Sequence, residues 1–360
     1  MLVAREVEVR AGARLLLAPS SFQVSAGDKV GLVGRNGAGK TTLTKILAGE
    51  ALPAAGQITR SGQIGYLPQD PRTGDLDTLA KDRILSARGL DSVLARLARY
   101  SMEMATETGE AQDAAMRSYT RAEAELAAAG GYAAESEAAR IAANLGLPDR
   151  VLGQPLRTLS GGQRRRVELA RILFSGADNL LLDEPTNHLD ADSIVWLRDY
   201  LKAYPGGVIL ISHDVGLLEA IVTKVFHLDA NRAELDQYAM DWKRYLLQRE
   251  TDEKRRKRER LNAERKAEQL LAQADKMRAK ATKAVAAQNM AKRAQKLLAS
   301  VEGERASDRV AKIRFPTPAP CGKVPLRGEE LSKSYGSLEV FTDVNLAIDK
   351  GSRVVILGLN

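Results

Sequence analysis

The sequence around residue 35 constrains the fold more than any other part of the chain. Residues 29–33 (KVGLV) predict a short buried strand, and residues 34–41 (GRNGAGKT) fit the pattern G-x-x-x-x-G-K-[ST], with a helix expected to begin at Lys40. Glycines allow a turn whose backbone N–H groups point inward, and such a turn at a helix N-terminus holds phosphate. The alternative, a glycine-rich turn without a ligand, is disfavoured by the strand–turn–helix setting. We therefore expect a nucleotide site.

The candidate nucleotide-binding residues follow from this pattern. Lys40 would place a positive charge on the β- and γ-phosphates, and the Thr41 hydroxyl would ligate Mg²⁺. The residues expected to surround the phosphates are Gly34, Arg35, Asn36, Gly37, Ala38, Gly39, Lys40, Thr41 and Thr42.

Strands and helices alternate through residues 1–239. We expect strands at residues 2–9, 15–24, 29–33, 63–67, 179–183 and 207–212, and helices at residues 40–48 and from residue 164. Residues 78–150 have a helical composition, with breaks at residues 108–109 and 130–131. This alternation predicts an α/β domain with a mostly parallel sheet.

Length and composition limit the class of protein. A chain of 360 residues can form two domains or more, each with its own core. The only cysteine, Cys321, cannot form an internal disulfide, which favours a reducing compartment. No apolar run approaches the length of a membrane span, and the N-terminus lacks the pattern of a signal peptide. These features predict a cytoplasmic protein without membrane insertion.

The excess positive charge is confined to one segment. The net charge is +8, and residues 243–314 carry 22 Lys and Arg against 10 Asp and Glu, so the remainder of the chain is slightly acidic. This segment has a thin apolar stripe and no proline before its end, which predicts two long helices in an antiparallel coiled-coil hairpin with its turn near residues 276–287. Residues 315–320 (FPTPAP) then break the helix.

The start of the chain is repeated at its end. Residues 330–360 parallel residues 6–36 without a gap, so that Asn360 aligns with Asn36. The second copy stops three residues into its own phosphate-binding loop. We therefore expect a tandem protein that is truncated within its second copy.

Further motifs accompany the phosphate-binding loop and together resemble one family. In chain order they are Gln69, Leu159-Ser160-Gly161-Gly162-Gln163, Asp183-Glu184, Leu189-Asp190 and His213. This set resembles the nucleotide-binding domain of ATP-binding cassette (ABC) proteins over residues 1–230. The resemblance implies binding of ATP and Mg²⁺ and hydrolysis of ATP on an α/β P-loop cassette with a helical subdomain.

The resemblance also implies roles for individual residues. Asp183 ends an apolar strand, where a metal-bound phosphate would lie, and it would hold Mg²⁺ together with Thr41 and Gln69. Glu184 would orient or deprotonate the attacking water. Gln69 and His213 are the other catalytic candidates, since the family's glutamine links the nucleotide state to motion and its histidine senses the γ-phosphate. The structural alternatives are a turn residue at Asp183 and a packed histidine at His213.

The signature at residues 159–163 completes the nucleotide site in the family, where ATP lies between the phosphate-binding loop of one cassette and the signature of another. Ser160, Gly161, Gly162 and Gln163 are therefore nucleotide-binding candidates, although this segment by itself could be a helix-capping loop. The sites would be shared with a second cassette or between two copies of this chain. Alone, the chain is expected to hydrolyse ATP slowly.

One position departs from the family pattern. Tyr335 in the second copy stands where the family places the aromatic residue that stacks on adenine, and the aligned residue in the first copy is Ala11. Ala11 offers no aromatic face, and the neighbouring Arg10 is a candidate to stack in its place.

The arrangement of segments resembles the ABC-F branch of the family. The features on which this resemblance rests are two cassette starts on one chain, a charged helical linker after residues 241–245 (DWKRY), and residues 280–284 (KATKA) within that linker. The resemblance implies a first cassette at residues 1–239 with a helical arm inserted at about residues 90–137, a basic coiled-coil linker at 240–315, and the β-rich start of a second cassette at 316–360. It further implies action on the ribosome, in translation or antibiotic resistance, with the linker reaching toward rRNA, tRNA and the peptidyl-transferase centre.

Three alternatives remain open. An ABC transporter ATPase subunit would share every cassette motif, although a basic coiled coil offers it no evident use. A chromosome-maintenance ATPase would have its coil between the phosphate-binding loop and the signature, whereas here the coil follows both. The linker itself could be a solvated coil, but its charge favours RNA phosphates. Trp242 and Tyr245 are expected to be packing anchors at the base of the hairpin rather than base-stacking platforms.

Overall fold

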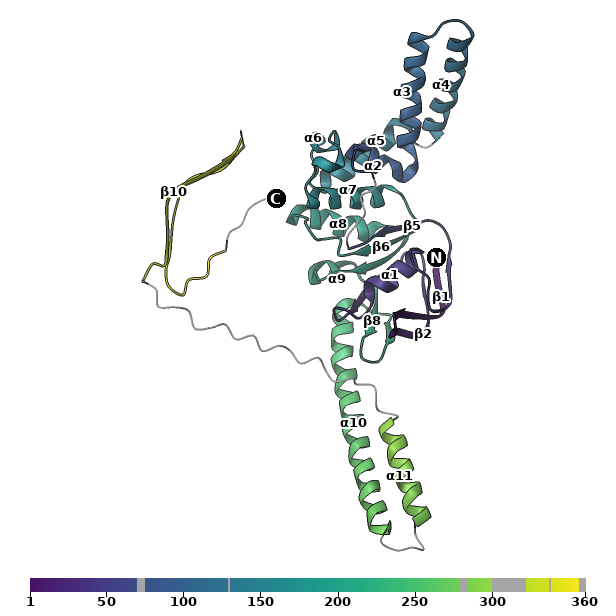
Figure 1. Cartoon of the computed structure of the whole chain (residues 1–360), viewed down its shortest axis with the longest axis vertical. Helices are drawn as coiled ribbons and strands as arrows, with labels where there is room; N and C mark the ends of the chain where they lie inside the picture. Colours follow the sequence, from purple (N-terminus) through teal and green to yellow (C-terminus); the bar gives the residue numbers. More distant parts are fainter. Residues whose placement is uncertain (70–74, 129, 279–283, 300–321, 337, 356–360) are drawn as a thin grey trace. The chain divides into compact units, whose positions relative to one another are not determined.

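The computed structural model describes residues 1–69, 75–128, 130–278, 284–299, 322–336 and 338–355 in two units, Met1–Arg305 and Ala306–Asn360 (Figure 1). Several expected features lie outside the described residues: most of the linker motif at 280–284, the helix-breaking segment at 315–320, Cys321, and the second phosphate-binding loop at 358–360.

A six-stranded sheet forms the centre of the first unit, in the order β5-β6-β7-β3-β8-β9. Strands β5 to β8 are parallel and β9 is antiparallel to β8, which confirms the predicted mostly parallel sheet. The strands are β3 (Lys29–Gly34), β5 (Ile64–Leu67), β6 (Asn179–Asp183), β7 (Gly207–Ile211), β8 (Lys224–Asp229) and β9 (Glu234–Tyr238). Parallel strands share their carboxyl edge, so the segments that follow β3, β6 and β7 meet there.

Each central strand contributes to two hydrophobic cores. Leu180 and Leu182 of β6 belong to one core, and Leu181 belongs to the other. The first core also takes in α7 (Gly161–Phe174), α8 (Ala191–Ala203) and α9 (Val215–Ile221), and the second takes in α1 (Lys40–Ala48). Burial on both faces explains why β6 and β7 read as continuous apolar runs.

A three-stranded antiparallel sheet, in the order β2-β1-β4, shares the core on the α1 side. Its strands are β1 (Leu2–Ala11), β2 (Arg14–Val24) and β4 (Ala55–Arg60). The sequence did not predict β4. Its segment AGQITR has one large apolar residue, Ile58, and the other side chains are exposed, so it lacks the alternation that marks a half-buried strand.

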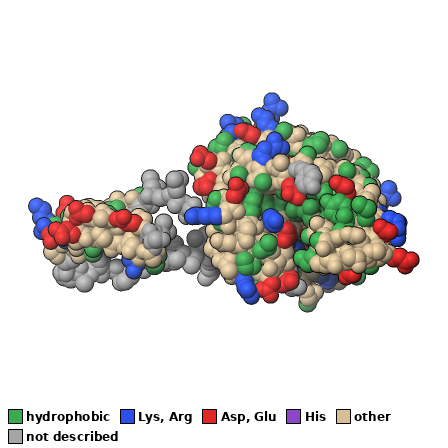
Figure 2. All heavy atoms as spheres, turned by 90° about the horizontal axis from the view of Figure 1, so that it is seen from above, with side chains coloured by type: hydrophobic (Ala, Val, Ile, Leu, Met, Phe, Trp, Pro, Cys, Tyr) green, Lys and Arg blue, Asp and Glu red, His purple; other side chains and the backbone are tan. Residues whose placement is uncertain are grey.

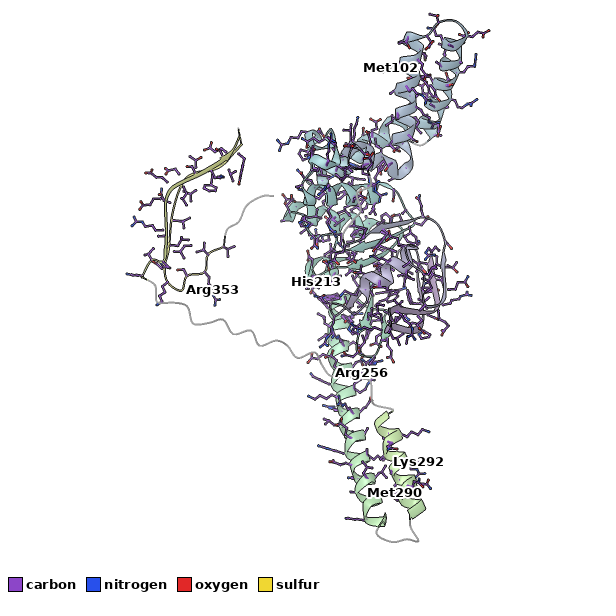
Figure 3. All side chains as sticks on the ribbon, in the orientation of Figure 1. Met102, His213, Arg256, Met290, Lys292 and Arg353 are labelled. Carbon is purple, nitrogen blue, oxygen red and sulfur yellow. The ribbon has the colours of Figure 1, made fainter. Side chains whose placement is uncertain are left out.

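A helical subdomain lies between β5 and β6 in sequence. It comprises α2 (Ala80–Leu85), η1 (Ser86–Arg88), α3 (Leu90–Thr106), α4 (Glu110–Ala128), α5 (Gly131–Asn144), α6 (Asp149–Leu152) and η2 (Leu156–Thr158). The helices break at Gly109 and Gly130 as predicted, and both glycines have positive φ. Helices α3 and α4 pack together as an arm, which carries Met102 (Figure 3). Helix α5 packs against α7, and its Ala138 and Ile141 belong to the first core.

The linker contains two helices that pack against each other, α10 (Trp242–Arg278) and α11 (Ala284–Ala299). Ala267 and Ala274 of α10 and Ala294 of α11 are buried, because small side chains let two helices approach closely. Figure 3 marks Arg256 on α10 and Lys292 on α11. The expected turn at 276–287 includes residues 279–283, which are not described.

The first turn of α10 is anchored in the first hydrophobic core. Trp242 and Tyr245 belong to the first core, and the ring of Tyr245 packs edge-on against Tyr238 with 5.1 Å between ring centroids. The prediction that both residues are packing anchors is confirmed.

The second unit contains a hairpin of β10 (Leu326–Tyr335) and β11 (Leu338–Ile348), with acidic and basic side chains on its visible face (Figure 2). Its pairing Leu326↔Ile348 matches Leu2↔Val24 of the first hairpin. Glu6 and the aligned Glu330 both adopt positive φ, at 48° and 51°. The repeat seen in the sequence therefore extends to backbone register and local irregularity.

Candidate functional site

The phosphate-binding loop joins β3 to α1, and its glycines meet tight neighbours. Gly34 has φ 157°, and a Cβ there would lie 2.6 Å from the carbonyl oxygen of Leu228. Gly39 has φ 105°, and a Cβ there would press against Leu16 at 3.0 Å. The Lys40 ammonium donates hydrogen bonds to the carbonyl oxygens of Gly34 (2.8 Å) and Arg35 (3.1 Å), and burial lowers the pKa of Lys40. The loop thus requires glycine at positions 34 and 39, and the Lys40 ammonium lies beside it.

Two of the three candidate metal ligands are brought together. Thr41 Oγ1 donates a hydrogen bond to Asp183 Oδ2 at 2.7 Å, although the residues are far apart in sequence. Asp183 is buried, which raises the pKa of its carboxyl, while the Thr41 hydrogen bond and the positive charge of Arg165 act in the opposite direction. A hydroxyl and a carboxylate are the hard oxygen donors that Mg²⁺ prefers, so the donor set at this point fits that ion.

Glu184 and His213 also lie together, at the ends of β6 and β7. The backbone N–H of His213 donates to Glu184 Oε2 at 3.3 Å, and His213 Nε2 lies 3.5 Å from Glu184 Oε1. Burial raises the pKa of the Glu184 carboxyl, and His213 partly offsets this. The His213 side chain is 73% exposed, so its ring remains open to a ligand. A carboxyl with a raised pKa beside a buried aspartate is suited to proton transfer.

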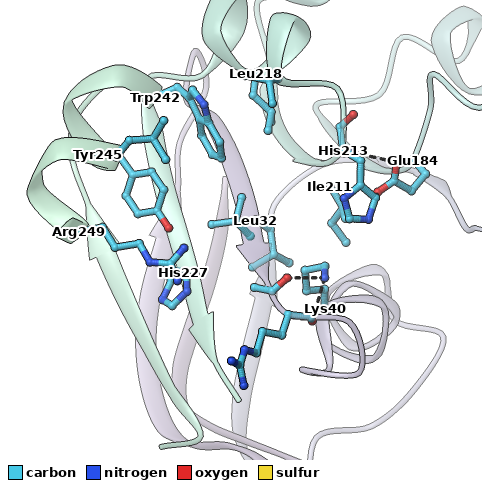
Figure 4. A pocket seen from close by; sticks show the side chains of 16 residues that line it. Leu32, Lys40, Glu184, Ile211, His213, Leu218, His227, Trp242, Tyr245 and Arg249 are labelled. Atoms are coloured by element: carbon cyan, nitrogen blue, oxygen red, sulfur yellow. Dashed lines mark hydrogen bonds and ion pairs between the residues drawn. The ribbon is translucent and has the colours of Figure 1, made fainter. Parts of the chain in front are cut away.

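A cavity of about 330 Å³ connects these residues to the base of the linker (Figure 4). Lys40, Glu184 and His213 line one part of it, and Tyr245 and Arg249 of α10 line another. The sequence did not predict that the linker reaches this cavity. Trp242 and Tyr245 at the start of the linker were the residues from which this contact could have been predicted, but their pattern indicated only that they pack in a core.

The third candidate metal ligand, Gln69, is placed differently. Gln69 follows β5 and is exposed, and its backbone carbonyl accepts a hydrogen bond from Arg165 Nη1. Among the described residues, no hydrogen bond joins the Gln69 side chain to Thr41 or Asp183. The segment that follows it, residues 70–74, is not described.

The signature forms the N-terminus of α7. Ser160 Oγ accepts a hydrogen bond from the Gln163 backbone N–H at 3.2 Å, and Gln163 Oε1 accepts one from the Ser160 N–H at 2.9 Å, which is a capping box. Gly161 and Gly162 complete the first turn. In the part of the chain that the structure describes, no hydrogen bond or ion pair links these four residues to the phosphate-binding loop.

Arg165 is a buried residue at the site that sequence reasoning missed. Its Nη2 donates to the carbonyl oxygens of Asp183 (2.8 Å) and Glu184 (2.9 Å). The arginine-rich onset of α7 was visible in the sequence, but which of its arginines points inward depends on tertiary packing.

Neither Ala11 nor Arg10, the residues of the first copy considered for contact with adenine, presents a face on which adenine would stack. Ala11 is exposed at the end of β1, and Arg10 forms an ion pair with Glu8 on the same strand. In the second unit Tyr335 is 68% exposed, with the Lys333 ammonium 5.0 Å from its ring centroid.

Comparisons with known proteins agree with this geometry. Residues 17–187 and 228–315 each match a family model described as ABC transporter. The probable ATP-binding protein YheS of Escherichia coli (strain K12) is 31% identical over 362 residues, covering 100% of this chain and 54% of YheS. ATP-binding cassette sub-family F member 3 of Homo sapiens is 33% identical over 357 residues, covering 98% of this chain and 48% of that protein.

A solved structure of an ATP-binding subunit of an ABC transporter is 20% identical, with a TM-score of 0.48, and covers 66% of this chain and 90% of that one. The chain spans about half the length of the curated relatives it matches. The two family models, together with the phosphate-binding loop and the carboxylates at the ends of the parallel strands, show that the chain belongs to the ATP-binding cassette ATPase family.

Proposed function

We propose that this chain is part of an ABC-F protein that binds and hydrolyses ATP and acts on the ribosome, to regulate translation or to confer antibiotic resistance. The observation that carries the hydrolytic part is the meeting of Lys40, Thr41, Asp183, Glu184 and His213 at one edge of the sheet. The sub-family F name of a relative with 33% identity supports the branch.

Each residue has a role in this proposal. Lys40 binds the β- and γ-phosphates, and the inward N–H groups of residues 34–42 hold the same anion. Thr41 and Asp183, with Gln69, would hold Mg²⁺, which supplies positive charge to the phosphates when bound. Glu184 orients the attacking water and accepts its proton, and His213 contacts the γ-phosphate.

The signature serves a different nucleotide. Ser160, Gly161, Gly162 and Gln163 would bind the ATP held by the phosphate-binding loop of a second cassette, because a helix N-terminus favours an anion. Among the described residues, no hydrogen bond or ion pair joins them to the loop of their own cassette, in keeping with this assignment. The partner is the second cassette of the longer protein or, for this chain alone, another copy of it.

The three segments have separate tasks. Residues 1–239 form the first cassette, with the arm at about 90–137, residues 240–315 form the basic linker, and residues 316–360 begin the second cassette. The positive charge of residues 243–314 supports contact with rRNA and tRNA. Because α10 lines the cavity beside Lys40 and Glu184, nucleotide at the loop and the position of the hairpin would be coupled.

Ribosome co-sedimentation tests this proposal. Glu184→Gln in the full-length protein should trap the ATP-bound state, so association with ribosomes should increase with ATP and not with ADP. Recovery with membranes instead of ribosomes would support the transporter alternative. Among the described helices, none is long and apolar enough to cross a membrane.

Salt dependence tests the linker. Lys257, Arg265 and Lys266 are exposed on α10, and replacing all three with Ala should weaken RNA binding and lower its salt slope by roughly 2 to 3. A matched control replaces three exposed cassette cations, Lys81, Arg150 and Lys202. An unchanged slope in the linker variant, or an equal change in both, would place the RNA contact elsewhere.

A further inference from the structure

Arg165 connects three segments of the cassette from a buried position. It lies in α7 just after the signature and is 7% exposed. Its Nη2 donates to the carbonyl oxygens of Asp183 and Glu184, and its Nη1 donates to that of Gln69. One guanidinium therefore holds the backbone at the carboxyl end of β6 and the loop after β5.

The backbone of Glu184 requires such support. Its φ is 52°, in the left-handed region, which a residue with a side chain adopts only when its surroundings fix it. The Glu184 N–H donates to the carbonyl oxygen of Ile211 at 2.8 Å, and the Glu184 carbonyl accepts from Arg165 at 2.9 Å. Strand β7 thus holds the amide on one side of this residue, and α7 holds the carbonyl on the other.

We propose that Arg165 is a positioning residue for ATP hydrolysis, which holds the Glu184 carboxylate at the phosphate site and ties it to the signature. This inference rests on the hydrolytic role proposed for Glu184. The hydrogen bonds of Arg165 to Gln69, Asp183 and Glu184 all end on backbone carbonyl oxygens, so we infer that it acts by positioning these segments. A guanidinium has five donors in a fixed plane, and a lysine ammonium cannot reach the same oxygens together.

The proposal also gives the signature a second effect. Ser160 and Gln163 form the first turn of α7, and Arg165 lies in the next turn of the same helix. A helix moves as a rigid element, so a shift of the signature on a second nucleotide displaces the Arg165 guanidinium. Engagement of one ATP by the signature is thereby linked to the alignment of Glu184 over another ATP in the same cassette.

The experiment compares Arg165→Lys with Arg166→Lys in the full-length protein. Arg166 is the adjacent residue of α7, is 8% exposed, and donates to the carbonyl oxygens of Leu145 (3.4 Å) and Gly146 (3.1 Å) in the helical subdomain. Both variants retain charge and lose a guanidinium that bonds buried carbonyls, so similar changes in Tm are expected. Arg165→Lys should lower kcat by about 10- to 100-fold with little change in KM, and Arg166→Lys should keep kcat.

Two further measurements make the outcome decisive. In Arg165→Ala, millimolar guanidinium should restore part of the rate, and it should not do so in Arg166→Ala, which tests the role even if the lysine variant folds poorly. Wild-type kcat in Arg165→Lys, equal losses of kcat in both lysine variants, or absence of rescue would overturn the inference. Glu184→Gln is measured alongside: if that variant keeps the wild-type rate, the proposed hydrolytic role fails, whereas its loss with a normal Arg165→Lys removes only the positioning role.

Discussion

Lys40 is held close to two carboxylates and to the carbonyl oxygens of its own loop. Burial lowers the pKa of Lys40, and the negative charges of Asp183 and then Glu184 partly offset this by favouring the protonated ammonium. Lys40→Ala should remove most nucleotide affinity, because the fixed cation beside the loop is lost. Titration with a fluorescent ATP analogue measures this, with Lys45→Ala, an exposed lysine of the same helix, as the control. Unchanged affinity in Lys40→Ala would contradict the assignment of the loop.

Glu184 should limit hydrolysis and set its response to acid. Glu184→Gln should keep ATP binding and lower kcat by about 10² to 10⁴, as expected for loss of a positioned base. Because burial raises the pKa of Glu184, its carboxylate is lost at a higher pH than for an exposed glutamate, so the rate should fall early on acidification. The check is the pH profile of kcat, with the exposed Asp192→Asn as the control. Wild-type turnover in Glu184→Gln would remove this residue from the mechanism.

Sequence motifs predicted the residues that meet at the site better than the residues that hold them there. Thr41 lies against Asp183 and Glu184 lies against His213, in line with the placement of these motifs at the carboxyl ends of parallel strands. Arg165 and Arg249 were not predicted as site residues. Their side chains reach backbone oxygens or a cavity formed by distant segments, and helical periodicity alone does not report such contacts.

The attachment of α10 includes a charged cluster beside its aromatic anchor. Asp236 of β9 lies next to His227, and Arg256 of α10 approaches it at 3.2 Å. The nearby His227 imidazole, with Nδ1 4.0 Å from Asp236 Oδ2, and then the charges of Arg256 and Arg232 lower the pKa of Asp236 to about 2. The linker helix is therefore fixed to the sheet by a carboxylate that stays ionised over the physiological range.

Asp236→Asn should destabilise the protein in a pH-dependent way. The folded pKa is depressed to about 2 from an unfolded value near 3.9, so the contribution of Asp236 is complete above the unfolded pKa and is lost as the pH falls toward 2. The difference in Tm between wild type and variant should be constant from about pH 5 to 7 and should shrink below pH 4. Asp192→Asn, at an exposed position of α8, is the control. A difference that grows with acid would contradict this account.

Helices and strands with a clear sequence pattern were predicted with accurate bounds, whereas elements without such a pattern were not. The helix at residues 40–48 and the strand at 179–183 match α1 and β6 in their bounds, because glycine turns and apolar runs mark both clearly. Helix α7 begins at Gly161 and not at residue 164, since the capping box draws two glycines into its first turn. The edge strand β4 has no such marks.

A shared nucleotide site makes activity depend on association. If each ATP needs a loop and a signature from different cassettes, the turnover per molecule of this chain should be low when dilute and should rise with protein concentration. A mixture of Lys40→Ala and Ser160→Arg chains should regain activity that neither has alone, because one intact loop then meets one intact signature. A high rate that does not change on dilution would rule out sharing for this chain.

The matched registers of the two hairpins carry a risk for folding. Strand β10 follows the same pairing pattern as β1. Each strand can therefore pair with the strands that normally neighbour the other, which is the usual route to strand exchange. The core-facing residues of β1 and their counterparts in β10 are Leu2 and Leu326, Ala4 and Gly328, Val7 and Leu331, and Val9 and Lys333. Val9 is 1% exposed, so β10 in its place would bury an unpaired ammonium, at a cost of several kcal/mol. Lys333 therefore disfavours insertion of β10 in the place of β1.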